Sequence, residues 1–92
     1  MTQEEWKNIY TVFKDTFDEY YLTENDYYNG KNQAVRNSGK RKMDVLRGRI
    51  RNYVGDNYEL WELIEFPDEM FTFQWFGRGF RKLLGKIKEK MQ

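Results

Sequence analysis

The chain has 92 residues, with 16 Lys and Arg against 15 Asp and Glu, a formal net charge of +1, and aromatic side chains at 18% of its positions. That length fits a single domain over residues 1–92 and argues against a second one. Cys and His are absent and no apolar run is long enough to cross a membrane. We therefore expect a cytoplasmic protein that is not an enzyme and has no metal or cofactor.

The charges fall into four blocks of alternating sign. Residues 1–30 hold two bases and seven acids, for a net charge of −5, and residues 31–55 hold eight bases and one acid, for +7. Residues 56–70 hold six acids and no base, whereas residues 71–92 hold six bases and one acid, for +5. The blocks nearly coincide with the structural segments predicted below, so each segment has its own charge.

The first segment is predicted to be a helix from about Thr2 to Tyr21. Thr2 and Glu5 have the spacing of a capping box, in which two side chains satisfy backbone N–H groups at a helix start. Apolar residues then recur at helical spacing: Trp6, Ile9, Tyr10, Phe13, Phe17, Tyr20 and Tyr21. The polar stretch that follows is predicted to be a loop, with a turn at Asn29 and Gly30.

A second helix is predicted from about Lys31 to Val54. Its apolar side comprises Val35, Met43, Leu46, Ile50, Tyr53 and Val54. Gly55 directly after it suits a helix end. Gly39 and Gly48 weaken its interior, by about 1 kcal/mol each relative to Ala.

A short third helix is predicted to begin near Asp56, whose spacing to Glu59 repeats the capping pattern, and to end at Phe66. Its acidic side could supply oxygen ligands to a divalent cation, although a solvated helix face is the more common reason for such a pattern. The residues of this side are Glu59, Glu62 and Glu65. Pro67 then fits the first turn of a new helix.

The last segment is predicted to be one continuous or kinked helix from about Asp68 to Lys90. Its apolar stripe comprises Phe76, Phe80, Leu83, Leu84, Ile87 and Met91. Residues 71–76 also alternate apolar and polar side chains, as a half-buried strand does. The predicted fold is therefore an all-α bundle of three to four helices, with an α+β domain as the alternative if that strand pairs with the region of Asn29 and Gly30.

The basic cluster of the second helix is the first candidate binding site. It comprises Lys40, Arg41, Lys42, Arg47, Arg49 and Arg51. On a helical wheel five of these cations flank the apolar stripe on both sides, and Arg41 lies nearly opposite it. They could contact phosphates or carboxylates of a partner, or be neutralised by the acidic segments of the same molecule.

The second candidate site lies near the start of the last helix, at Trp75, Arg78, Arg81 and Lys82. Exposed Trp and Tyr beside Arg are typical of binding hot spots and of platforms on which nucleic-acid bases stack. The aromatic residues that fit the helical stripes least well are Trp75, Phe71, Tyr27 and Tyr28. The alternative is that these residues have a structural role, in a loop that packs onto the core.

The apolar stripe of the last helix has several possible uses. It could fill the core of the domain, close a homodimer, or lie on a membrane surface or in a groove of another protein. Core packing is the use we favour, because a bundle of this size needs such a stripe for its own interior.

These features predict a non-catalytic adaptor or inhibitor that docks on a protein or nucleoprotein partner through a basic helix face and exposed aromatic residues. Direct binding of nucleic acid through phosphate contacts of residues 40–51 is the alternative. In composition alone, the chain resembles many small phage-encoded proteins.

Overall fold

The computed structural model describes residues 1–92 and contains five helices and no strand. They are α1 (Gln3–Asn29), α2 (Gln33–Val54), α3 (Tyr58–Leu63), α4 (Pro67–Met70) and α5 (Phe76–Lys90). The all-α prediction is confirmed, with one helix more than the three to four expected, and the alternative with a strand at residues 71–76 is wrong. No helix combines the length and the apolar character that crossing a membrane requires.

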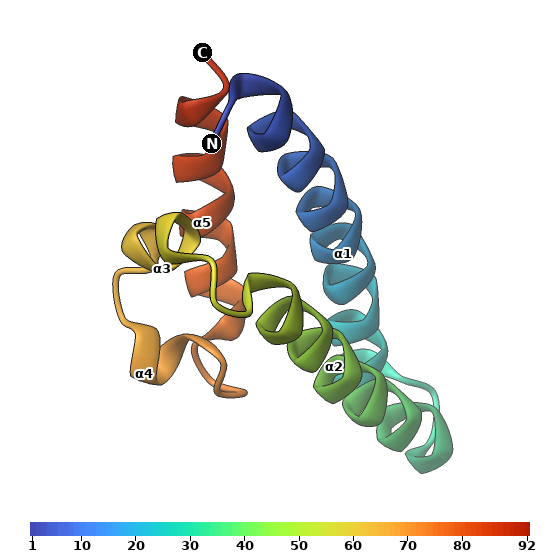
Figure 1. Cartoon of the computed structure of the whole chain (residues 1–92). Helices are drawn as coiled ribbons and strands as arrows, with labels where there is room; N and C mark the ends of the chain where they lie inside the picture. The colour runs from blue at the N-terminus through green and yellow to red at the C-terminus, as the bar shows by residue number, and fades with distance from the viewer.

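The helices form an elongated molecule of 45 × 24 × 18 Å. α1 and α2 make a long antiparallel hairpin, α5 lies beside α1, and α3 and α4 lie on the side of α5 away from α1 (Figure 1). The closed end of the hairpin projects beyond α5, whereas the two chain termini lie together at the opposite end (Figure 1). A hydrogen bond of 3.3 Å from the side chain of Gln3 to the carbonyl of Gln92 joins those termini.

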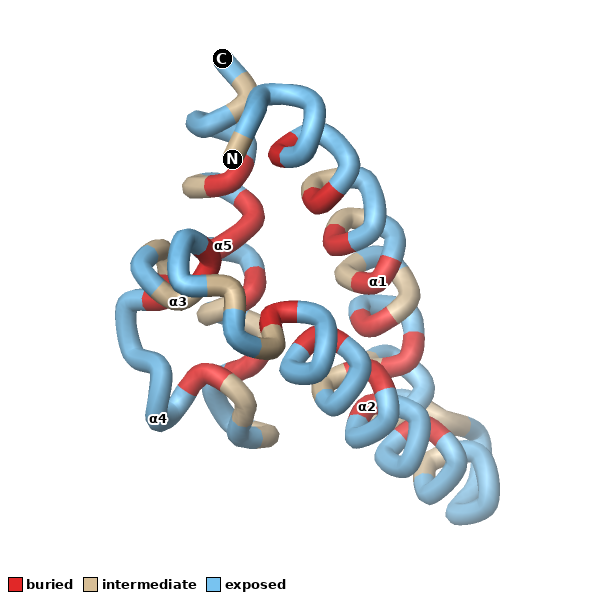
Figure 2. The backbone as a smooth tube through the Cα atoms, viewed as in Figure 1, coloured by how far each residue is buried: buried red, intermediate tan, exposed pale blue.

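The core lies where α1, α2 and α5 face each other, and Figure 2 shows the buried residues on the inward turns of these helices. Edge-to-face aromatic contacts join α1 to α5: the ring centroids of Phe13 and Phe80 are 5.7 Å apart, and those of Tyr20 and Phe76 are 4.9 Å apart. The apolar stripe of α5 is buried in this core, except for Met91 after the helix end, which is partly buried. The stripe is therefore an internal seam of the bundle.

α1 continues to Asn29, so the loop predicted directly after Tyr21 is wrong. Thr23 is buried and its hydroxyl donates a hydrogen bond to a carbonyl one turn earlier, which satisfies the polar group inside the bundle. Tyr27 packs edge-to-face on Phe73, with ring centroids 5.5 Å apart. Polar and aromatic residues thus extend the buried side of α1 where apolar periodicity has ended.

α2 agrees closely with its predicted bounds. The side chain of Asn32 caps its start by accepting a hydrogen bond from the backbone N–H of Val35. Gly39 is buried against α1, and a Cβ atom at this position would lie only 2.9 Å from the backbone nitrogen of Tyr27. The glycine therefore allows the two helix backbones to approach closely. Val35 and Tyr53, which were expected on the apolar side, are exposed.

α3 is shorter than predicted at both ends. Asn57, and not Asp56, caps its start by accepting a hydrogen bond from a backbone N–H of the first turn. The helix ends at Leu63, before the expected end at Phe66. The ammonium group of Lys86 on α5 donates a hydrogen bond of 3.1 Å to the carbonyl of Leu63, which satisfies a carbonyl at the helix end.

The single helix predicted from residue 68 to residue 90 is also wrong, because a turn at residues 71–75 separates α4 from α5. The ring of Phe71 packs on a tryptophan of α3, and the ring of Phe73 packs on a tyrosine of α1. Side chains two positions apart do not face each other along a helix. The turn allows both rings to reach the core from this one segment.

Candidate binding surface

The predicted cations of α2 lie on both sides of the helix, and several bind acids of their own chain. Lys42 and Arg49 face α1, where both form ion pairs with the carboxylate of Glu19, at 3.6 and 3.7 Å. Arg47 forms an ion pair with Asp44 on α2 itself. The two pairs with Glu19 are exposed and therefore individually weak. They nevertheless place negative charge directly beside the basic cluster.

Arg47 and Arg51 contact aromatic rings on the other side of α2. The guanidinium group of Arg51 lies 4.8 Å from the ring centre of Trp61 and 5.8 Å from that of Phe71, and that of Arg47 lies 5.4 Å from the ring centre of Phe73. Cation–π contacts of this kind are favourable by about 0.5–1 kcal/mol even where water reaches them. These two arginines therefore help to hold α3 and the turn at residues 71–75 against α2.

Lys40 and Arg41 differ from the other four cations of the cluster. Both are exposed and neither forms an ion pair. They lie in the N-terminal half of α2, directly after the buried Gly39. The structure thus separates the predicted cluster into paired, stacked and free cations.

The predicted residues at the start of α5 lie close together. Trp75 directly precedes the helix, and the guanidinium group of Arg78 lies 5.6 Å from the centre of its ring. The guanidinium group of Arg81 lies 5.8 Å from the ring centre of a phenylalanine on α1. Neither arginine has a carboxylate partner, whereas Lys82 forms a 3.6 Å ion pair with Glu65.

A groove of about 710 Å³ lies between α1 and α5, and we call it the α1–α5 groove. Its aromatic side chains are Phe17, Tyr20, Tyr21, Tyr28 and Phe73. Its cations are Arg78, Arg81 and Lys82, and its only carboxylate is that of Glu24. A Cβ atom on Gly77 would lie 3.7 Å from that carboxylate, which therefore sits beside the positive end of α5. Cations outnumber acids in the groove.

The three tyrosines of the α1–α5 groove have different surroundings. Tyr20 is buried and its hydroxyl accepts a hydrogen bond of 3.4 Å from Arg47. Burial raises the pKa of Tyr20 above its usual value, and the hydrogen bond from Arg47 opposes this shift. Tyr21 and Tyr28 are exposed, so their rings and hydroxyl groups are available to a second molecule.

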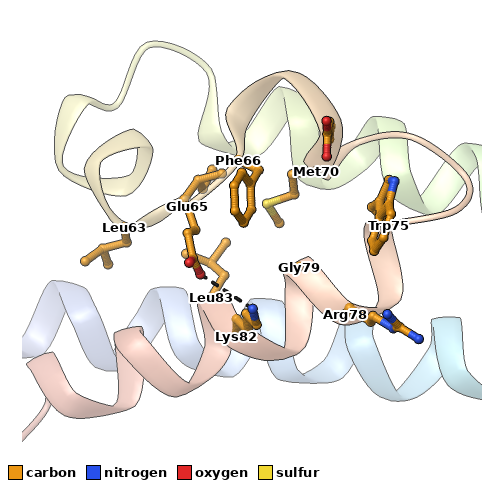
Figure 3. Close-up of a pocket in the computed structure, with 11 residues that line it drawn as sticks. Leu63, Glu65, Phe66, Met70, Trp75, Arg78, Gly79, Lys82 and Leu83 are labelled. Atoms are coloured by element: carbon orange, nitrogen blue, oxygen red, sulfur yellow. Dashed lines mark ion pairs between the residues drawn. The ribbon is translucent and has the colours of Figure 1, made fainter.

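A smaller groove of about 270 Å³ lies between α4 and α5, and we call it the α4–α5 groove. Figure 3 shows Phe66 and Trp75 standing over α5 on either side of Gly79, with Met70 between the two rings. The ion pair of Glu65 and Lys82 spans this groove (Figure 3). Arg78 and Lys82 line both grooves. The two hollows therefore flank the same exposed ridge of α5.

Sequence reasoning missed part of this surface. Phe17, Tyr20 and Tyr21 were assigned to the apolar stripe of the first helix, although Tyr21 is exposed. The spacing of three or four residues from Phe17 to Tyr21, Glu24 and Tyr28 was the available signal for a second side of α1 beside the buried one. No sequence pattern indicated that Phe66 is exposed, because its exposure depends on where α3 ends and α4 begins.

The acidic side of α3 does not assemble a metal site. Glu59 forms an ion pair of 2.8 Å with the N-terminal amine, and Glu65 pairs with Lys82. The nearby carboxylate of Glu62 raises the pKa of the Tyr58 phenol. No group of three or more carboxylates in the molecule is arranged to hold a metal ion.

The chain matches no protein-family model, no curated protein and no solved structure with which it was compared.

Proposed function

We propose that the protein is a non-catalytic binding domain of the adaptor or inhibitor kind, which docks on an acidic surface of a protein or nucleoprotein partner. The observation that carries this proposal is the α1–α5 groove, where exposed tyrosines lie beside Arg78 and Arg81. Tyr, Trp and Arg are the residues that most often dominate the binding energy of protein interfaces. Carboxylates of a partner would form charge-assisted, bidentate hydrogen bonds with these two guanidinium groups, which have no carboxylate partner in the molecule.

The titratable groups support a binding role. Lys14, Tyr20 and Tyr58 have shifted pKa values, and all three are shifted upward, away from neutral pH. Catalytic acids and bases are usually tuned towards the pH at which they work. The chain has neither His nor Cys to supply such a group, and its lack of Cys suits the reducing cytoplasm in which we place it.

The surface of α5 is favoured over that of α2 because of the ion pairs. Lys42, Arg47 and Arg49, half of the α2 cluster, have acidic partners within the molecule, whereas of the three cations at the start of α5 only Lys82 has one. The net charge of the chain is only +1, and salt screens exposed charges beyond about 8–10 Å. Recognition should therefore depend on contacts made within the grooves and only weakly on long-range attraction.

Affinity purification from the native cell, with and without nuclease treatment, tests this proposal. We expect one protein to co-purify at a stoichiometric level after nuclease treatment, and to be lost from the double variant Arg78→Gln/Arg81→Gln. The matched control is Lys40→Gln/Arg41→Gln, which removes the same charge from the N-terminal half of α2. A partner that is lost equally from both double variants, or no enriched partner at all, would contradict the proposed surface.

Direct binding of nucleic acid is a second candidate function, favoured by the adjacent free cations Lys40 and Arg41. Each phosphate contact contributes about 0.9 to the slope of log affinity against log salt on duplex DNA. Lys40→Gln/Arg41→Gln should therefore flatten this slope by roughly 2. Fluorescence anisotropy with a random-sequence duplex at several salt concentrations measures the slope, and a lack of binding at low salt would eliminate this candidate.

A further inference from the structure

We infer that the α4–α5 groove receives an apolar side chain of the partner, from a segment whose neighbouring carboxylates lie along the cations of α5. This inference rests on the proposed function. The bound segment of the partner would have one apolar side chain between acidic residues.

The groove has an apolar floor between two exposed aromatic rings. Phe66 is 60% exposed and Trp75 is 44% exposed, while Met70 between them is buried. A Cβ atom on Gly79 would lie 3.2 Å from the Cγ atom of Met70, so the glycine lets this adaptable side chain lie close to α5. The volume of about 270 Å³ is slightly below the ~300–1,000 Å³ of pockets that bind small-molecule ligands, and it suits one side chain.

Both aromatic rings occupy positions where a helix normally gains stability from a polar residue. Phe66 is the N-cap of α4 and Trp75 is the N-cap of α5, and neither helix start has a side-chain capping hydrogen bond. The other three helices are capped by Thr2, Asn32 and Asn57. An apolar N-cap forgoes typically about 1 kcal/mol relative to these residue types. The aromatic rings at the groove are therefore not explained by the stability of the helices that they begin.

The charges around the groove define how an acidic segment would lie. Arg78 and Lys82 belong to the α5 wall, and they also line the α1–α5 groove. Glu65 and Glu69 belong to the opposite wall, where Glu65 is paired with Lys82 and Glu69 has no ion pair. Carboxylates of the occupant would approach Arg78, which lies on the α5 wall and has no ion pair within the molecule. The same segment can then contact both grooves.

Titration of the isotopically labelled full chain with two synthetic peptides tests this inference. The first is a short peptide of Glu and Ser with one central Leu, and the second has Ala in place of that Leu. We expect the Leu peptide to bind about tenfold more tightly, which is the change that burial of one leucine side chain supports. The NMR signals of the Trp75 indole N–H and the Gly79 backbone N–H should shift during the titration.

Substitutions at the groove sharpen the test. Phe66→Ala and Trp75→Ala should remove the difference between the two peptides, whereas the control Tyr58→Ala should retain it. Tyr58 is 72% exposed and lines neither groove, so the control removes an aromatic ring elsewhere on the surface. All three side chains are exposed, and circular dichroism would verify that each variant folds. Glu69→Gln should tighten binding of the Leu peptide about twofold, because it removes a repulsive charge near the exposed site.

The possible results separate the inference from the proposed function. Equal affinity for the two peptides, with binding still weakened by Arg78→Gln, would overturn the inference and leave the proposed function standing. Binding that is unaffected by Arg78→Gln/Arg81→Gln would contradict both. Tighter binding of a peptide with Lys in place of Glu, weakened by Glu69→Gln, would show that the groove prefers a basic occupant. Shifts of the Trp75 signal with protein concentration alone would show that a second copy of the chain occupies it, and either result would overturn the inference.

Discussion

Tyr20 connects three parts of the molecule through one ring and one hydroxyl group. The ring packs on Phe76 of α5, and the hydroxyl accepts a hydrogen bond from Arg47 of α2. The guanidinium group of Arg47 lies in turn over the ring of Phe73, in the turn that precedes α5. Because burial disfavours the charged phenolate, the pKa of Tyr20 is raised. The free energy of unfolding should therefore decrease as the pH rises through the alkaline range.

We expect Tyr20→Phe to reduce the loss of stability at high pH. In the unfolded chain a tyrosine ionises near pH 10, whereas Tyr20 in the folded chain stays neutral to higher pH. The stability that comes from this difference is fully present below about pH 10 and is lost as pH rises through the folded pKa. At neutral pH the variant should lose about 0.5–1.5 kcal/mol, because it lacks one hydrogen bond.

Urea unfolding at about pH 8 and about pH 10.5, on either side of the usual ionisation of tyrosine, measures this effect. Tyr21→Phe is the control, because the Tyr21 hydroxyl is exposed to water. The same alkaline loss of stability in the wild type and in Tyr20→Phe would contradict the assigned role of burial.

At the scale of one element, α2 contains two glycines with opposite roles. Gly39 lies at the crossing with α1, where an added Cβ atom would meet the backbone of Tyr27. Gly48 is exposed, and an added Cβ atom there would meet no atom within 4 Å. Both are in the helix interior, where Gly is about 1 kcal/mol less favourable than Ala. The fold therefore requires only the first of them.

The two glycines give a matched pair of substitutions. We expect Gly48→Ala to raise the free energy of unfolding by about 0.5–1 kcal/mol. Gly39→Ala should lower it by about 1–3 kcal/mol, because the two helices must move apart to admit the methyl group. Urea unfolding of both variants measures the changes, and stabilisation by Gly39→Ala would show that α1 and α2 do not approach closely at this position.

At the scale of the whole molecule, the hairpin of α1 and α2 is supported along only part of its length. None of the residues between Thr23 and Gly39 is buried, whereas the part nearer α5 contains the core (Figure 2). Tertiary packing supplies most of the stability of a helix in a protein. The projecting end should therefore open locally more often than the rest of the hairpin.

Native-state hydrogen exchange would measure this difference. We expect the backbone N–H groups of residues 26–37 to exchange with lower protection than those of residues 43–54, although both stretches are largely helical. Equal protection of the two stretches would mean that the hairpin opens only together with the whole molecule, and that the projecting end is stabilised by more than the contacts seen here.

The candidate site could be predicted in part. Trp75, Arg78, Arg81 and Lys82 were identified from composition and position, and they do lie together because they are neighbours along one helix start. Neutralisation of the α2 cations by acidic segments of the same molecule could be predicted as an alternative. The partner residue, Glu19, could not be predicted, since α1 and α2 meet only in the folded chain. Phe66 could not be found, because its exposure arises where two short helices meet.

The sequence by itself determined the all-α class, the extent of α2, and the apolar stripe that α5 buries, because helical periodicity and capping are properties of a few neighbouring residues. Only the tertiary structure decided where α1 ends, where the last segment breaks, and which cations remain free. Those outcomes depend on contacts between distant residues, such as Tyr27 with Phe73 and Glu19 with Arg49. Such contacts follow from the packing of helices against each other, and no local pattern specifies them.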